Sequence, residues 1–174
     1  KPAVISAIMK QQTTERGRDV INNAMDIYAG SAICLGDNNF IEKYYKAAPV
    51  GITVEGSNTL TKNLIIFGQG LNKSHPYIFP VYESILNDNY PQFRSSMFNM
   101  VRHFIGCYLN VFMPFETGIR SQTFVFANLS NFVALLGGKI KSNQSISGDM
   151  ADVLSNLYLG YSLIWYNMCN KTSP

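Results

Sequence analysis

Glu55 is the residue in this chain whose surroundings best suit acid–base chemistry. It lies in the stretch Thr53 to Asn58, just before Gly56, and Ser57 or Asn58 can cap a helix that begins there. Backbone N–H groups at the start of a helix point outward and favour negative charge. A carboxylate beside such donors could take a proton while the donors stabilise the oxyanion that forms. Most acidic residues in this position are only helix caps, so the pattern alone favours a structural role.

The helix that positions Glu55 is expected over residues 58–68. Gly68 and Gly70 are expected to end it. Apolar residues recur at helical spacing and should form its buried face: Leu60, Leu64 and Phe67.

The chain before Glu55 predicts two helices. Residues 3–28 read as one long helix, because apolar residues recur every three or four positions towards both of its ends. Ala29-Gly30-Ser31 is expected to end it. A shorter helix is expected over residues 38–47, with Pro49 breaking it.

The second half of the chain predicts further helices. Their expected positions are 79–87, a helix from Pro91 to Pro114, 121–136, and a last helix capped by Ser147 or Asp149. Helices joined by short turns indicate an all-α fold, an antiparallel helical bundle. The most apolar stretch, Met97 to Phe115, contains Arg102 and His103, so it is expected to be a buried helix and not a membrane span.

Composition narrows the class of protein. The 174 residues are 47% hydrophobic and only 14% charged, against about 25% charged in ordinary soluble domains. This shortfall indicates surface that a partner chain or other parts of the same protein should cover. Lys and Arg exceed Asp and Glu by only three and form no basic run, which argues against nucleic acid as a partner.

The cysteines and histidines offer no obvious site. Cys34, Cys107 and Cys169 are far apart and odd in number, so neither disulfides nor a metal site is expected, and a reducing compartment fits best. His75 and His103 have no nucleophile or metal partner at useful spacing, so both are expected to be structural.

Two motifs resemble a known family. Asp26 to Ala32 ends a helix in a small-residue turn around Gly30, and Glu55-Gly56-Ser57 follows about 25 residues later. Residues 13–75 thus resemble the C-terminal helical domain of acyl-CoA dehydrogenases. The amino-acid sequences of four segments are similar to the large bacterial long-chain branch of this family: 24–27, 52–56, 65–70 and 75–77. The resemblance continues beyond residue 75, at 135–138 and 152–158.

The resemblance implies that this chain is a C-terminal fragment of a longer enzyme, which the start at Lys1 without a methionine also suggests. Residues 1–78 would be the part of the C-terminal helical domain that carries the base. Residues 79–174 would be an additional helical extension packed on it.

The resemblance also implies an activity. The parent would be an FAD-dependent acyl-CoA dehydrogenase that converts long-chain fatty acyl-CoA to trans-2-enoyl-CoA in fatty acid β-oxidation. Glu55 would remove the α-proton, a hydride would pass to the flavin, and an electron-transfer flavoprotein would take the electrons. The thioester oxygen would be held by the backbone N–H of Glu55 and a hydroxyl of FAD.

Cofactor contacts follow residue by residue from the same resemblance. Gly56 and Ser57 would lie close to the flavin. The Gly30 turn would approach the adenosine diphosphate part of an FAD bound mainly by a neighbouring subunit, with Asp26 as a further contact. Asp26 stands where many members have glutamine, and Ala29 and Ala32 stand where glycines are usual.

These implications carry expectations and leave alternatives. The fragment alone is expected neither to hold FAD tightly nor to catalyse, and to associate as a homodimer or higher oligomer. A cytoplasmic location is expected, and the parent could sit at the surface of the inner membrane. One alternative is an all-helical interaction or scaffold domain in which Glu55 is only a cap. The other is an acyl-CoA oxidase, which shares the base but passes electrons to oxygen.

Overall fold

The computed structural model describes residues 2–71, 75–112 and 118–170 of the chain. Within these ranges it contains helices and no strand, which confirms the all-α fold. The elements are α1 (Pro2–Tyr28), α2 (Gly30–Ile33), α3 (Glu42–Thr53), α4 (Asn58–Leu60), the π-helix η1 (Thr61–Gln69), α6 (Ile78–Leu86), α7 (Tyr90–Val111), α8 (Ile119–Ala134), the 3₁₀ helix η2 (Gly137–Lys141) and α9 (Gln144–Asn170).

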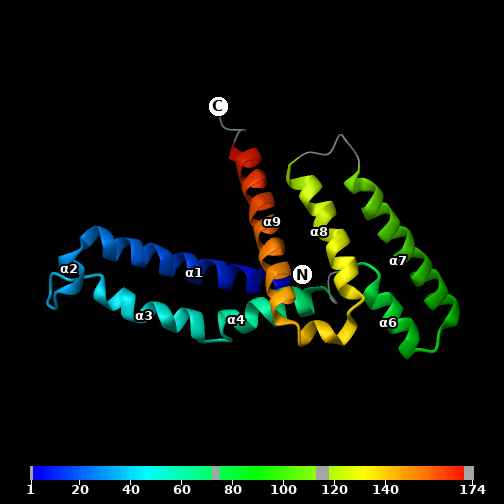
Figure 1. Cartoon of the computed structure of the whole chain (residues 1–174), viewed down its shortest axis with the longest axis horizontal. Helices are drawn as coiled ribbons and strands as arrows, with labels where there is room; N and C mark the ends of the chain where they lie inside the picture. The colour runs from blue at the N-terminus through cyan, green and yellow to red at the C-terminus, as the bar shows by residue number, and fades with distance from the viewer. Residues whose placement is uncertain (1, 72–74, 113–117, 171–174) are drawn as a thin grey trace.

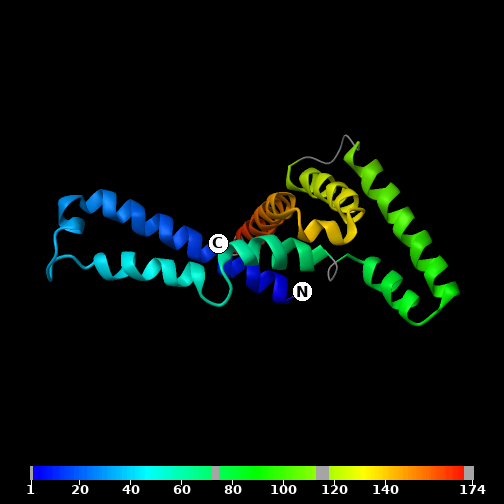
Figure 2. The ribbon, with the colours of Figure 1, turned by 60° about the horizontal axis from the view of Figure 1, so that its bottom comes forward.

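The helices pair in chain order and form an elongated molecule (Figure 1). Helices α1 and α3 make an antiparallel hairpin with α2 at its tip, and α6 and α7 make a second hairpin at the opposite end. Helices α7, α8 and α9 follow one another between that end and the centre, as Figure 2 also shows. The antiparallel pairing follows the prediction, but the two hairpins point away from each other.

Helix η1 lies at the centre, packed between α1 and α9. The core is built from these three helices and η2, with α8 at its edge. Its buried members are Val4, Ala7, Ile8, Ile66, Phe67, Ile140, Met150 and Ala151. Residues from both proposed parts of the chain, 1–78 and 79–174, belong to this core. The division at residue 78 remains a prediction.

The prediction of which residues form the buried face of the segment after Glu55 was partly wrong. Ile66 and Phe67 are almost fully buried, at 0% and 1% exposure, whereas Leu60 is 44% exposed. The prediction assumed α-helical spacing, but a π-helix places its hydrogen bonds five residues apart and turns different side chains inward. Gly68 does not end the helix. The π-helix ends at Gln69 with Gly70 as its C-cap, but Gly70 has a helical φ of −60°, packs against Val4 of α1, and lets the helical backbone continue to Leu71.

The prediction that Pro49 breaks a helix was also wrong. Helix α3 begins at Glu42, whose N–H is accepted by the side chain of Asn39, and runs through Pro49 to Thr53. A proline inside a helix removes a hydrogen bond and crowds the preceding turn. Here α3 lies along α1, with Gly51 closely packed on Thr14, so tertiary packing outweighs the local penalty.

Helix α7 is not buried within the described residues, contrary to expectation. Only Ser96 and Cys107 of this helix are buried. Large apolar side chains on it are at least half exposed: Phe98, Val101, Ile105, Tyr108 and Leu109. The expected end at Pro114 lies outside the described residues. None of the described helices has the length and apolar character needed to cross a membrane.

The junction between α9 and η1 differs from the sequence prediction. Helix α9 begins at Gln144, so Ser147 and Asp149 lie inside it and cap nothing. The hydroxyl of Ser147 instead donates a hydrogen bond to the backbone carbonyl of Asn63 in η1. A Cβ added at Gly148 would lie 2.7 Å from Asn63 Oδ1. The two helices therefore approach closely at a point where α9 has only a serine and a glycine.

We predict that Gly148→Val lowers the free energy of unfolding by about 2 kcal/mol, because the added side chain overfills this contact. Gly17→Val is the matched control, since Gly17 is exposed on α1 with nothing near its Cβ position, and it should change stability by less than about 0.5 kcal/mol. Chemical denaturation of both variants measures the difference. Equal effects at the two positions would show that the α9–η1 approach does not hold the fold.

Candidate functional site

Glu55 lies in a tight turn between α3 and α4. Its φ is +55° and that of Gly56 is +87°. Glycine adopts such a conformation freely, but a residue with a side chain pays about 1–2 kcal/mol for it. Strain of this kind persists where the surrounding structure enforces it, and it clusters at functional sites.

Helix α1 enforces the turn through Lys10. The Nζ of Lys10 donates to the carbonyl oxygen of Gly56 at 2.8 Å and to Asn58 Oδ1 at 2.7 Å. Asn58, only 4% exposed, in turn donates from Nδ2 to Thr14 Oγ1 and Glu15 Oε1, both at 2.8 Å. Charge-assisted hydrogen bonds are among the strongest in proteins, so this network fixes the turn against α1.

The start of α4 confirms one of the two expected caps. Ser57 Oγ accepts the N–H of Leu60 at 3.2 Å, so Ser57 is the N-cap, and Asn58 serves the network with Lys10 instead. The side chain of Glu55 is exposed beside this helix start. The arrangement can present a carboxylate to a molecule that approaches from outside the chain.

The four residues expected to contact a cofactor do not come together within this chain. Asp26 and Gly30 lie at one end of the α1–α3 hairpin, while Gly56 and Ser57 lie beyond the other end of α3, whose twelve residues span about 18 Å. The φ of Gly56 requires glycine, and a Cβ there would make only ordinary contacts, the nearest 3.8 Å from Thr61 Oγ1. Gly30 shows no such requirement: its φ is ordinary and Ala29 carries the positive φ of +44°.

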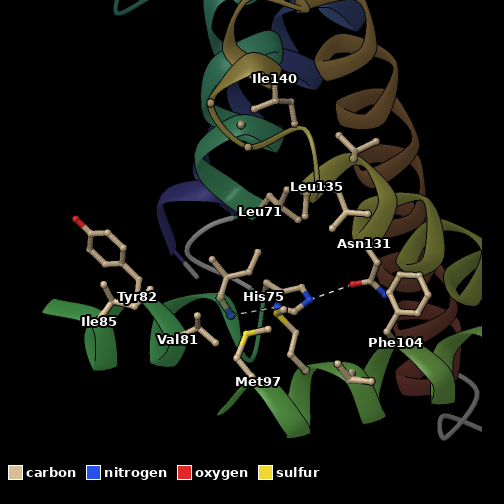
Figure 3. Close-up of a pocket in the computed structure, with 18 residues that line it drawn as sticks. Leu71, His75, Val81, Tyr82, Ile85, Met97, Phe104, Asn131, Leu135 and Ile140 are labelled. Atoms are coloured by element: carbon tan, nitrogen blue, oxygen red, sulfur yellow. Dashed lines mark hydrogen bonds between the residues drawn. The ribbon is translucent and has the colours of Figure 1, made fainter. Parts of the chain in front are cut away.

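A separate pocket of about 760 Å³ opens among the end of η1, α6, α7, α8 and η2 (Figure 3). Its lining is mostly aliphatic and aromatic, and none of the described residues that line it is Lys, Arg, Asp or Glu. The described lining side chains that can form hydrogen bonds through nitrogen or oxygen are His75, Tyr82 and Asn131. Glu55 does not line this pocket.

The hydrogen bonds of His75 define its proton position. Its Nδ1 accepts the backbone N–H groups of Tyr77 at 3.2 Å and Ile78 at 3.3 Å, so it caps the start of α6 and carries no proton. The proton of the neutral ring is therefore on Nε2, which donates to Asn131 Oδ1 at 3.1 Å. This fixes the Asn131 amide with its oxygen towards His75 and its nitrogen turned away, as Figure 3 shows.

Electrostatics keep His75 neutral. Burial lowers the pKa of His75, the nearby His103 lowers it further, and the hydrogen bond to Asn131 opposes the shift. The hydrogen bonds and the lowered pKa of His75 agree, because a proton on Nδ1 would face two N–H donors that cannot accept it. His75 is thus a structural cap for α6.

His103 does have a possible nucleophile at useful spacing, so the expectation for it was wrong in that respect. Cys107 lies one helical turn later in α7, with its Sγ 3.6 Å from His103 Nε2. Burial raises the pKa of the Cys107 thiol, so it stays protonated and does not form a reactive thiolate. No described residues form a cluster of three or more metal-ligating groups.

The comparison with protein families falls on the C-terminal part of the chain. Residues 114–168 match the family model described as acyl-CoA dehydrogenase, C-terminal, bacterial type. This match fits a C-terminal fragment of an acyl-CoA dehydrogenase. The matched segment covers α8, η2 and nearly all of α9, so it is separate from the motifs at residues 26–32 and 55–57 that carried the resemblance. No solved structure matches this chain.

The pocket was missed in the sequence analysis. The available signal was three polar residues, Asn128, Ser130 and Asn131, in an otherwise apolar stretch of α8. All three are buried. Asn128 donates a hydrogen bond to the Cys107 carbonyl of α7 at 2.9 Å and so joins α8 to α7, whereas Asn131 lines the pocket.

We predict that His75 makes stability depend on pH. Because its folded pKa lies below the ordinary value of 6.5, its contribution is complete above pH 6.5 and is lost as pH falls through the folded pKa. The free energy of unfolding should therefore drop between pH 7.5 and pH 5. His75→Asn keeps an acceptor for the start of α6 and should reduce this drop.

Denaturant titrations at several pH values measure this pH dependence of the free energy of unfolding. His103→Gln is the matched control and should keep most of the drop, since His103 is only the smallest of the three causes acting on His75. An identical pH dependence in His75→Asn and in the unchanged chain would contradict the assignment.

Proposed function

We propose that this chain is part of an acyl-CoA dehydrogenase that acts with FAD on long-chain fatty acyl-CoA, and that Glu55 is the base that removes the α-proton. The observation that carries the proposal is the strained, exposed Glu55 held in place by Lys10 and Asn58. A helix cap has no need of this strain, since Ser57 already caps α4. The match at residues 114–168 supports the family independently of this turn.

The chemistry follows from the turn. The α-proton of an acyl thioester is weakly acidic, so a carboxylate needs help to remove it. Burial by the rest of the enzyme would raise the proton affinity of Glu55, and donors at the thioester oxygen would stabilise the enolate. The backbone N–H of Glu55 is the proposed donor from this chain. FAD, when bound, would accept the hydride from the β-carbon.

The division of the cofactor contacts supports an oligomer. Gly56 and Ser57 lie at one end of α3 and Asp26 and Gly30 at the other, so we propose that they meet FAD molecules of different subunits. Exposed apolar side chains on α1 and α3, such as Val20, Ile27 and Val50, provide surface for such contacts. The proposed electron acceptor is an electron-transfer flavoprotein, and the proposed location is the cytoplasm.

The test is anaerobic mixing of the full-length protein with a long-chain acyl-CoA, followed by flavin absorbance. Glu55→Gln should slow bleaching at least about a hundredfold, because a positioned general base contributes on that scale. Glu55→Gly should be equally slow yet more stable, because glycine relieves the strain at φ +55°. This pairing separates a role in chemistry from a role in folding.

Glu83→Gln is the control, since Glu83 is an exposed carboxylate on α6 and its change should leave bleaching as it is. Fast bleaching in Glu55→Gln would show that another group takes the proton. Absence of bleaching in the unchanged protein would refute the proposed activity.

A further inference from the structure

We propose that the exposed face of α7 pairs, antiparallel, with the same face of α7 in a second copy of this chain. Helix α7 lies at the outer edge of the molecule, at the end opposite the α1–α3 hairpin (Figures 1 and 2). It packs on α6 and α8, and large apolar side chains remain exposed on its outer side. This interface is separate from the Glu55 turn and from the surface of α1 and α3, and it does not rest on the proposed function.

The exposed face of α7 has the spacing of a coiled-coil seam. Its outward positions follow one another in alternating steps of four and three residues: Arg94, Phe98, Val101, Ile105, Tyr108 and Phe112. A stripe this narrow keeps facing one partner helix when two helices wind around each other. A loop, a sheet or a lipid surface requires no such regular spacing. The pattern therefore indicates that the occupant is a helix.

The seam is large enough for a stable dimer. Its five apolar side chains are between 50% and 68% exposed, and Leu109 beside them is 57% exposed. Since a whole aromatic side chain has about 150–250 Å² to bury, the stripe offers roughly 600–800 Å² per copy. A standard protein–protein interface takes about 800 Å² from each partner. One further copy of the same helix is thus enough to cover the seam.

The charge of Arg94 decides the direction of pairing. In a parallel pair the two Arg94 guanidinium groups would lie together, and α7 carries no Asp or Glu to compensate them. In an antiparallel pair Arg94 lies opposite Phe112 of the second copy, where a guanidinium group is attracted to the aromatic face. The other layers then join side chains of similar size: Phe98 with Tyr108, and Val101 with Ile105.

The antiparallel pairing is self-complementary. Each layer occurs twice about a two-fold axis at the level of residue 103, so both copies use the same surface, as in most homodimers. Part of the seam is ordered in advance, because the rings of Tyr108 and Phe112 pack edge to face with their centroids 5.2 Å apart. Arg102 is exposed beside the seam, where solvent screens its charge from that of its counterpart.

Disulfide cross-linking of the full-length protein tests the register, with Phe98→Cys and Tyr108→Cys in one chain. The two positions are separated by about 15 Å of helix, too far for a bridge within one copy. Mild oxidation should link position 98 of one copy to position 108 of the other, as mass spectrometry of the linked peptides will identify. Phe98→Cys alone should give no link. Links of 98 to 98, or no link in the double variant, would overturn the proposal.

Light scattering of the full-length protein tests the strength of the interface. Ile105→Lys places a charge at the centre of the seam and should halve the mass of the assembly, because loss of one two-fold contact divides it in two. Ile105 is half exposed, so the variant should keep its helical circular dichroism spectrum. Leu163→Lys is the matched control, since Leu163 is similarly exposed on α9, and it should leave the mass unchanged.

Two other occupants of the seam would give different results, and either would overturn the proposal. An unchanged mass in Ile105→Lys, with α7 amides protected from hydrogen exchange in the unchanged protein, would show that another part of the same protein covers the seam. An unchanged mass together with binding of the unchanged protein to phosphatidylglycerol vesicles would show a lipid surface. None of these measurements uses catalysis, so failure here is distinguishable from failure of the base at Glu55.

Discussion

The burial of η1 between α1 and α9 is the constraint on which the rest of the structure depends. Ile66 and Phe67 are almost wholly removed from solvent, and each such side chain contributes about 1.5–3 kcal/mol. Because domains are stable by only roughly 5–15 kcal/mol in total, losing either contact would remove a large part of the net stability. Since η1 follows the Glu55 turn and leads into the wall of the pocket, one buried helix positions both sites.

The Glu55 turn shows how local strain and tertiary contacts balance. A left-handed backbone conformation costs a residue with a side chain about 1–2 kcal/mol of stability. A hydrogen bond to a charged group stabilises the fold by about 1.5–3 kcal/mol. Lys10 makes two such short bonds, to Gly56 and Asn58, so α1 can hold the strained turn. The carboxylate thereby gains a fixed position that a loop alone would not provide.

The sequence predicted the features that depend on local pattern. Apolar periodicity located α1 and α6, and residue chemistry identified the turn at Glu55 and the cap at Ser57. Features that depend on packing were missed. The run of α3 through Pro49 and the π-helical spacing of η1 are set by neighbouring helices, which a single sequence does not show.

The Glu55 turn and the pocket show the same contrast between local pattern and tertiary packing. Glu55 was proposed from three adjacent residues, whereas the pocket joins His75 and Asn131, which are 56 residues apart. The exposed apolar face of α7 illustrates a further limit: an apolar helix indicates surface to be covered, but composition does not say whether this chain covers it.

The most direct test of the account concerns the link between Lys10 and Glu55. The measurement is deuterium exchange at the α-carbon of a long-chain acyl-CoA in D₂O, followed by mass spectrometry, with the full-length protein and its Lys10→Met variant. We expect exchange in Lys10→Met to be slower by up to about a hundredfold, because the carboxylate is retained but misplaced. Unchanged exchange in a folded Lys10→Met protein would contradict the claim that this network holds the base.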